Sequence, residues 1–149
     1  MNNLNAYKPI TPEKLIEIGV ERLEQLIRPA GLHRVKAVKL VEAARFVKDR
    51  LNGDLKPTLK LPLEEARSIL MAIPGIGDKT ADVMMVFAGC RPVLPVDTHI
   101  KRVSKRMGIA GVKDGYGEVK AKLEELVSPD ERGVTHLALI DIATVKIGL

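Results

Sequence analysis

Apolar residues recur at helical spacing along most of this chain, and no stretch longer than four residues alternates between apolar and polar positions as a strand does. In residues 33–51, for example, the apolar positions form one stripe and the basic residues lie mainly outside it. The pattern predicts an all-α fold. Helices are expected from Thr11 to Gly19 and over residues 20–27, 33–51, 63–73, 78–88, 97–107, 119–127 and 128–147, with loops at 55–62 and 108–117.

A proline and two closely spaced glycines, in the stretch Ile-Pro-Gly-Ile-Gly-Asp-Lys-Thr, separate two of these helices. Pro74 is expected to end the first helix, because proline restricts the residue before it. Gly75 and Gly77 allow a tight turn with exposed backbone N–H groups, and Asp78 is a suitable N-cap for the next helix. Amides at a helix N-terminus bind phosphate well, and Lys79 would lie beside them.

A second polar residue, Asp97, follows the glycine turn after one helix and one extended connector. The helix contains the apolar run 83–88 and is expected to be buried on most sides. An extended connector with two prolines, residues 89–96, comes next, and Asp97 is then the expected N-cap of a further helix. The basic residues of that helix form either a DNA-facing cluster or a solvated helix face; they are Lys101, Arg102, Lys105 and Arg106.

Composition narrows the class of partner. The formal net charge is +5 and the sequence pI about 9.4, which favours a polyanion. The single cysteine excludes an internal disulfide and a four-cysteine metal site. Since neither a membrane-spanning apolar run nor a signal-peptide pattern is seen, the expected location is the cytoplasm, with the nucleoid. Scarce glutamine and abundant lysine and glutamate hint at a thermophilic source.

The glycine turn, taken together with Pro-Val-Asp-Thr-His-Ile-Lys-Arg-Val at residues 95–103, resembles the endonuclease III family of DNA glycosylases in the HhH-GPD superfamily. Members share a helix-hairpin-helix motif, then a Gly/Pro-rich loop and an aspartate. The resemblance covers roughly residues 11–140. It implies a helical DNA glycosylase fold in a single region over residues 1–149, with the helix-hairpin-helix at 63–88 and the aspartate-bearing and C-terminal helices at 97–147.

The resemblance also implies an activity in DNA base excision repair. Lys79 matches the nucleophile of members that are both DNA glycosylases and abasic-site (AP) lyases, and Asp97 matches the partner carboxylate. The lysine amine attacks C1′ and forms a Schiff base that permits β-elimination. We expect burial and the helix N-terminus to favour the neutral, nucleophilic amine of Lys79. Contacts with double-stranded DNA carrying a damaged base or abasic site are implied for Pro74, Gly75, Ile76, Gly77, Thr80, Lys101 and Arg102, and a monovalent cation for the hairpin carbonyls.

Three departures from the family pattern affect these expectations. The front helix of typical members has no counterpart, so the fold is expected to be incomplete at the N-terminus, with an uncovered apolar groove that favours self-association. The four cysteines of the [4Fe-4S] loop have no counterpart either, so no cofactor is expected. Asp78 stands where the family often has a basic residue, and it slightly repels phosphate.

Simpler interpretations stay open. Lys79 is an ordinary phosphate-contacting lysine in one of them, and Asp97 is only a helix N-cap. His99 and His136 are interpreted as packing or hydrogen-bonding residues. The chain as a whole is then a non-catalytic DNA-binding module, an inactive fragment, or a protein-interaction domain with no DNA role.

Overall fold

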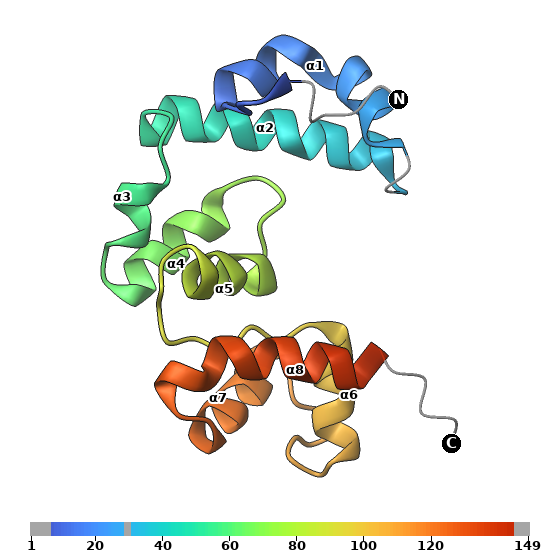
Figure 1. Ribbon diagram of the computed structural model, residues 1–149, viewed down its shortest axis with the longest axis vertical. Helices are drawn as coiled ribbons and strands as arrows, with labels where there is room; N and C mark the ends of the chain where they lie inside the picture. Colours follow the sequence, from blue (N-terminus) through green and yellow to red (C-terminus); the bar gives the residue numbers. More distant parts are fainter. Residues whose placement is uncertain (1–6, 29–30, 145–149) are drawn as a thin grey trace. The chain divides into compact units, whose positions relative to one another are not determined.

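The computed structural model describes residues 7–28 and 31–144. Over these residues the chain forms helices and no strand, which confirms the all-α prediction (Figure 1). The expected continuation of the last helix to residue 147 lies outside the described residues. The chain divides into two compact units, residues 1–76 and 77–149, and each is described by itself.

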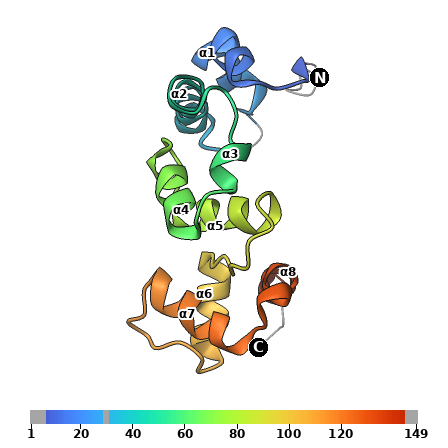
Figure 2. The same ribbon diagram turned by 90° about the vertical axis from the view of Figure 1, so that its left-hand side faces the viewer.

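The first unit is built on two helices that lie side by side (Figures 1 and 2). Leu23 of the first packs with Ala37 and Val41 of the second to form a small apolar core. As predicted, Gly19 interrupts the first helix, with φ +74° and ψ 168°. The helices of this unit are α1 (Pro12–Leu26), α2 (His33–Leu51), α3 (Lys56–Leu59) and α4 (Leu63–Ala72).

The short helix α3 lies where a loop was predicted. Pro57 is in its first turn, where a missing N–H costs nothing. Asp54 Oδ1 accepts a hydrogen bond of 2.9 Å from Lys56 N just before it. Thr58 and Leu59 are buried. A four-residue helix is too short to show a periodic pattern, and burial at its end holds it in place.

The second unit comprises α5 (Asp78–Phe87), α6 (Thr98–Arg106), α7 (Tyr116–Leu126), the 3₁₀ helix η3 (Pro129–Glu131) and α8 (Arg132–Thr144). Helix α8 contacts both α5 and α6, and α6 also contacts α7. The core includes residues of the connector between α5 and α6 and of the loop between α6 and α7 as well as helical residues: Leu94, Val96, Ile100, Ala110, Val119 and Leu123. The second half of the connector, residues 93–96, is therefore a buried part of the unit.

Two details of α5 differ from the prediction. Gly77, not Asp78, is the N-cap, and Asp78 is the first helical residue, where a carboxylate favours the helix dipole. The helix is also less buried than expected: Met85 is buried, but Phe87 is 47% exposed. An apolar run occupies every face of a helix, whereas α8 covers only part of the surface of α5.

Helix α7 begins three residues before the predicted start at residue 119. Gly115 is its N-cap, and Glu118 Oε2 accepts a hydrogen bond of 3.0 Å from Gly115 N. The end of the long loop is therefore replaced by a helical turn that contains Tyr116. This difference matters below, because Tyr116 points its hydroxyl into the unit.

Candidate functional site

The glycine turn begins in the first unit. Ile76 N donates a hydrogen bond of 3.1 Å to Ile73 O, which closes the turn. Gly75 has φ +86°, in the left-handed region that favours glycine. A Cβ at this position would lie 3.2 Å from Cβ of Lys39 on α2. Both conformation and space therefore require glycine at position 75. Pro74 and Ile76, on either side of it, are half-buried.

Gly77, the first residue of the second unit, is different. Its φ of −106° and ψ of −174° are extended backbone that any residue adopts. A Cβ there would meet no atom within 4 Å. The fold does not require glycine here, and the backbone is open on the side where a Cβ would stand. The first N–H groups of α5, which have no partner within the helix, follow directly.

Lys79 lies in the first turn of α5, as predicted, and the exposed Thr80 follows it. The expectation that Lys79 is buried is wrong, because its side chain is exposed. The apolar residues of α5 begin after this turn, so no packed neighbour covers the lysine. Its amine is open to a ligand that approaches the N-terminus of the helix.

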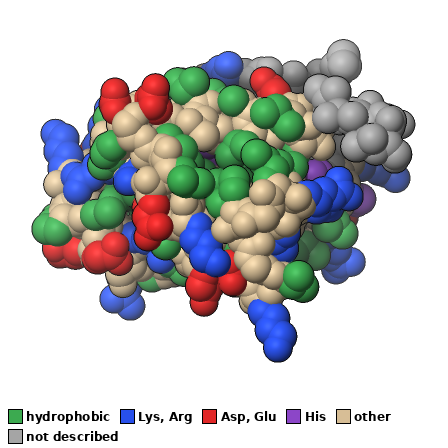
Figure 3. All heavy atoms as spheres, turned by 90° about the horizontal axis from the view of Figure 1, so that it is seen from below, with side chains coloured by type: hydrophobic (Ala, Val, Ile, Leu, Met, Phe, Trp, Pro, Cys, Tyr) green, Lys and Arg blue, Asp and Glu red, His purple; other side chains and the backbone are tan. Residues whose placement is uncertain are grey.

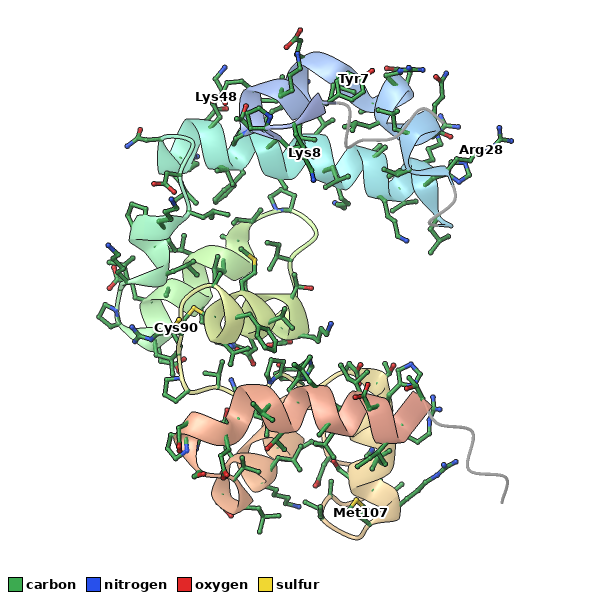
Figure 4. All side chains as sticks on the ribbon, in the orientation of Figure 1. Tyr7, Lys8, Arg28, Lys48, Cys90 and Met107 are labelled. Carbon is green, nitrogen blue, oxygen red and sulfur yellow. The ribbon has the colours of Figure 1, made fainter. Side chains whose placement is uncertain are left out.

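Asp97 is the N-cap of α6, which confirms the sequence prediction. Its Oδ1 accepts a hydrogen bond of 2.7 Å from Ile100 N, and the residue is half-buried. Met107, labelled in Figure 4, follows the opposite end of α6.

Lys79 lies on α5 and Asp97 caps α6, and both of these helices contact α8. Among the described residues, no hydrogen bond or ion pair joins the two side chains.

The basic residues of α6 have different surroundings. Arg102 and Arg106 are exposed, and Lys101 is half-buried. Lys105 donates to the carbonyl of Val112 and so ties α6 to the following loop. On the face of the molecule seen in Figure 3, basic side chains are interspersed with acidic and hydrophobic ones. The excess positive charge is not collected into one patch on that face.

The sequence analysis missed a buried polar network around Asp82, which lies one helical turn after Lys79 on α5. Its carboxylate is 0% exposed. Oδ2 accepts hydrogen bonds from the Tyr116 hydroxyl, at 2.6 Å, and from Lys120 Nζ, at 2.7 Å. The sequence has one signal of this network: Asp82 stands directly before the apolar run of a helix that was expected to be buried. A buried charge requires a partner, so a partner for Asp82 could have been expected.

The same network reaches the connector that leads to Asp97. Glu124 Oε1 accepts a hydrogen bond of 2.8 Å from Leu94 N, and the Tyr116 hydroxyl lies 3.4 Å from Val96 N. His136, 2% exposed, places Nδ1 2.9 Å from Pro95 O. Since a carbonyl oxygen only accepts, Nδ1 carries the proton. The prediction that His136 is a packing or hydrogen-bonding residue is confirmed.

An open apolar groove of about 580 Å³ lies in the second unit. Val86 and Phe87 of α5 line it, with Val134 and Leu137 of α8. Cys90, labelled in Figure 4, lies at its edge and is exposed. Self-association through an apolar groove stays a prediction.

The residues of this chain do not fit an iron–sulfur cluster of the family type. Such a cluster is held by four cysteine thiolates, and Cys90 is the only cysteine in the sequence. Within residues 7–28 and 31–144, no group of His, Cys, Asp and Glu side chains is arranged to hold a metal ion. None of the helices in this described part is long and apolar enough to cross a bilayer.

Comparisons with known proteins are consistent with this geometry. Endonuclease III of Bacillus subtilis is 35% identical over 129 residues, a match that covers 87% of this chain and 55% of the relative. Endonuclease III of Escherichia coli is 34% identical over 130 residues, covering 87% and 57%. The chain thus spans somewhat more than half the length of these curated relatives.

Solved structures give the same result. A trapped covalent intermediate of endonuclease III with DNA, an estranged-adenine complex, matches with a TM-score of 0.76 and 37% identity, covering 87% of this chain and 57% of that one. A thermostable thymine-DNA glycosylase matches with a TM-score of 0.75 at 22% identity, which shows the fold alone. The family model for HhH-GPD superfamily base excision DNA repair proteins matches residues 1–129. This chain therefore belongs to the HhH-GPD superfamily of base excision DNA repair proteins.

Proposed function

We propose that this chain acts on double-stranded DNA in base excision repair, as a DNA glycosylase that is also an abasic-site lyase. The observation that carries the proposal is the exposed amine of Lys79 in the first turn of α5, directly after the open backbone of Gly77. A nucleophile at this place is accessible to a deoxyribose whose phosphate is bound by the turn. The endonuclease III relatives support the same activity.

In this proposal, phosphate binds at the start of the second unit, from Gly77 to Thr80, and Pro74, Gly75 and Ile76 stay predicted DNA contacts of the first unit. The open face of Gly77 lets a phosphate approach the N–H groups at the start of α5, and the helix dipole favours its negative charge. Lys101 and Arg102 add charge contacts from α6. A monovalent cation on the carbonyls of the turn is part of the proposal, since its positive charge would also favour phosphate.

Lys79 and Asp97 have separate roles in the proposed reaction. Nζ of Lys79 bonds to C1′, the glycosidic bond breaks, and its electron pair leaves with the base. Asp97 accepts the proton that the amine loses, or stabilises the positive charge that develops on the sugar. Opening of the sugar ring gives the Schiff base. Loss of a proton from C2′ then expels the 3′ phosphate.

Exposure of Lys79 has a consequence for this reaction. Attack on C1′ requires the lone pair of a neutral amine. In this proposal, bound DNA covers the exposed amine of Lys79, excludes water from it and so favours the neutral form.

A non-catalytic DNA-binding module is the second candidate. Two observations favour it: Lys79 is exposed in the way that a phosphate-contacting lysine is, and Asp97 Oδ1 is used as a helix cap. In that case Lys79 contributes only charge to DNA binding.

Strand cleavage at an abasic site distinguishes the two candidates. The variant Asp97→Asn is suitable because asparagine is as good an N-cap as aspartate, so α6 is expected to stay intact. If the chain is a lyase, wild type cleaves the strand at the abasic site. The variant is then expected to bind the same duplex normally but to cleave it at least about tenfold more slowly, because one acid–base group contributes a factor of about a hundred or more to a rate. If neither protein cleaves and both bind equally, the chain is a binding module.

A further inference from the structure

The buried carboxylate of Asp82 occupies a central place in the second unit. It lies on α5, the helix that carries Lys79, and both of its identified donors lie on α7. Lys120 is 15% exposed on its side chain, so the ion pair is largely removed from water. Burial of such a pair often contributes no more stability than apolar side chains of similar volume. Stability alone therefore gives a weak account of this network.

Both branches of the network continue to the connector between α5 and α6. In the first branch, the Tyr116 hydroxyl donates to Asp82 and lies where it accepts from Val96 N, at 3.4 Å. In the second, Lys120 Nζ lies 4.0 Å from Glu124, whose Oε1 accepts from Leu94 N. The two backbone amides that donate to these branches belong to Leu94 and Val96, which come shortly before Asp97 in the chain.

We propose that Tyr116 is a positioning residue for Asp97: its hydroxyl couples the buried carboxylate of Asp82, on the helix of Lys79, to the backbone of Val96. The inference rests on the proposed function, because it assigns a role in the lyase reaction. The tyrosine hydroxyl contacts both the Asp82 carboxylate and the backbone of the connector directly. It fixes the backbone that carries the Asp97 carboxylate relative to the helix that carries the nucleophile.

The expected size of the effect follows from geometry. A displacement of about 1 Å in a reacting group costs up to about 100-fold in rate. Loss of one of the two branches leaves the other, together with the His136 bond to Pro95 O. We therefore expect the variant Tyr116→Phe, which removes only the hydroxyl, to lower the rate by roughly tenfold.

The test compares Tyr116→Phe with wild type, and the matched control is Tyr7→Phe, a change in the only other tyrosine, which lies in the first unit. Two quantities are measured on folded protein. One is the single-turnover rate of Schiff-base trapping with borohydride on a duplex with one abasic site, together with the dissociation constant for that duplex. The other is the amide hydrogen exchange of Val96, with the amides of α6 and α8 as internal reference.

The proposal predicts that the Schiff base of Tyr116→Phe is trapped roughly tenfold more slowly than that of wild type, with an unchanged dissociation constant for the duplex. The Val96 amide of this variant is expected to exchange faster relative to the reference amides. Tyr7→Phe is expected to behave as wild type in both measurements. A merely structural tyrosine would lower the unfolding midpoint but leave both readouts unchanged in folded protein, and that result overturns the proposal. If Tyr116→Phe does not fold, Asp82→Asn weakens the acceptor of the same hydroxyl and gives smaller changes of the same sign.

Failure of the proposed function is distinguishable from failure of this inference. If wild type forms no adduct, the lyase proposal fails, and the exchange of Val96 alone decides whether Tyr116 positions the connector. Unchanged exchange of Val96 in Tyr116→Phe then overturns the coupling. If wild type forms the adduct and Tyr116→Phe forms it at the same rate, the lyase stands and the positioning role is refuted.

Discussion

Separate replacement of Gly75 and Gly77 by alanine is expected to have unequal effects on stability. Gly75 has φ +86°, and an added Cβ would lie 3.2 Å from Cβ of Lys39. That neighbour is attached directly to the backbone of α2 and cannot rotate away. Gly77 has extended backbone and no atom within 4 Å of an added Cβ. Although the two glycines look equivalent in the sequence, only Gly75 needs to be glycine for the fold.

The magnitudes follow from these geometries. At Gly75, the left-handed conformation costs an L-residue about 1–2 kcal/mol, and the close contact adds to that. At Gly77, alanine lowers the entropy of the unfolded chain, which stabilises by about 0.4–1 kcal/mol. Alanine is also a poorer N-cap than glycine, which offsets a gain of that size. The expected loss is at least about 1 kcal/mol for Gly75→Ala and within about 0.5 kcal/mol of zero for Gly77→Ala.

Urea unfolding followed by circular dichroism measures both free energies. Equal losses for the two variants would refute the geometric reasoning. The functional counterpart uses Gly77→Val, whose larger side chain is expected to block phosphate from the start of α5. It should weaken binding to all DNA sequences alike while the unfolding midpoint stays close to that of wild type. Normal DNA binding by this variant would show that the turn is not the DNA anchor.

Three further outcomes are expected. Asp82→Ala removes the nearer partner of the largely buried Lys120 ammonium and leaves it only the contact of 4.0 Å with Glu124, which should cost up to about 3–5 kcal/mol of unfolding free energy in urea. Hydrogen bonding from Lys122 lowers the pKa of Asp114. The contact therefore stabilises the folded chain at pH values above the ordinary aspartate range, and this stabilisation is lost as the pH falls through the lowered pKa. NMR of the Asp114 carboxyl carbon measures that titration. Arg102→Gln should weaken binding to all DNA alike and reduce the slope of log affinity against log salt by about one.

Each of these outcomes has its control or its contradiction. Asp130→Ala, at an exposed carboxylate of η3, should leave the unfolding midpoint unchanged, and a loss as large as that of Asp82→Ala would argue against a specific role for burial. An Asp114 titration midpoint at or above the ordinary value of about 3.9 would contradict the Lys122 contact. An unchanged salt slope in Arg102→Gln would remove Arg102 from the DNA-contacting residues.

The sequence predicted the local features of this fold well. The bounds of α2 match the prediction residue for residue, because an amphipathic stripe ended by Asn-Gly defines both ends. The cap at Asp97 was likewise readable, since an N-cap depends on one residue and its neighbours. Helix α3 was missed because four residues show no period.

The arrangement around the candidate site was less predictable. The partners of Asp82 lie 34 and 38 residues further along the chain, and nothing in local spacing identifies them. Lys79 was expected to be buried in the first turn after the glycine turn, but the apolar run of α5 starts beyond that turn and the lysine is exposed. Contacts that depend on tertiary packing have no periodic signal in the sequence.

Borohydride trapping tests the central claim most directly. Wild type and Lys79→Ala are each incubated with a duplex that carries one abasic site, and covalent adducts are separated by denaturing electrophoresis. Peptide mapping then locates the modified residue. The proposed lyase predicts an adduct with wild type, located on Lys79, and none with Lys79→Ala. Absence of an adduct from helical, folded wild-type protein that binds the duplex, or an equal adduct in Lys79→Ala, would contradict it.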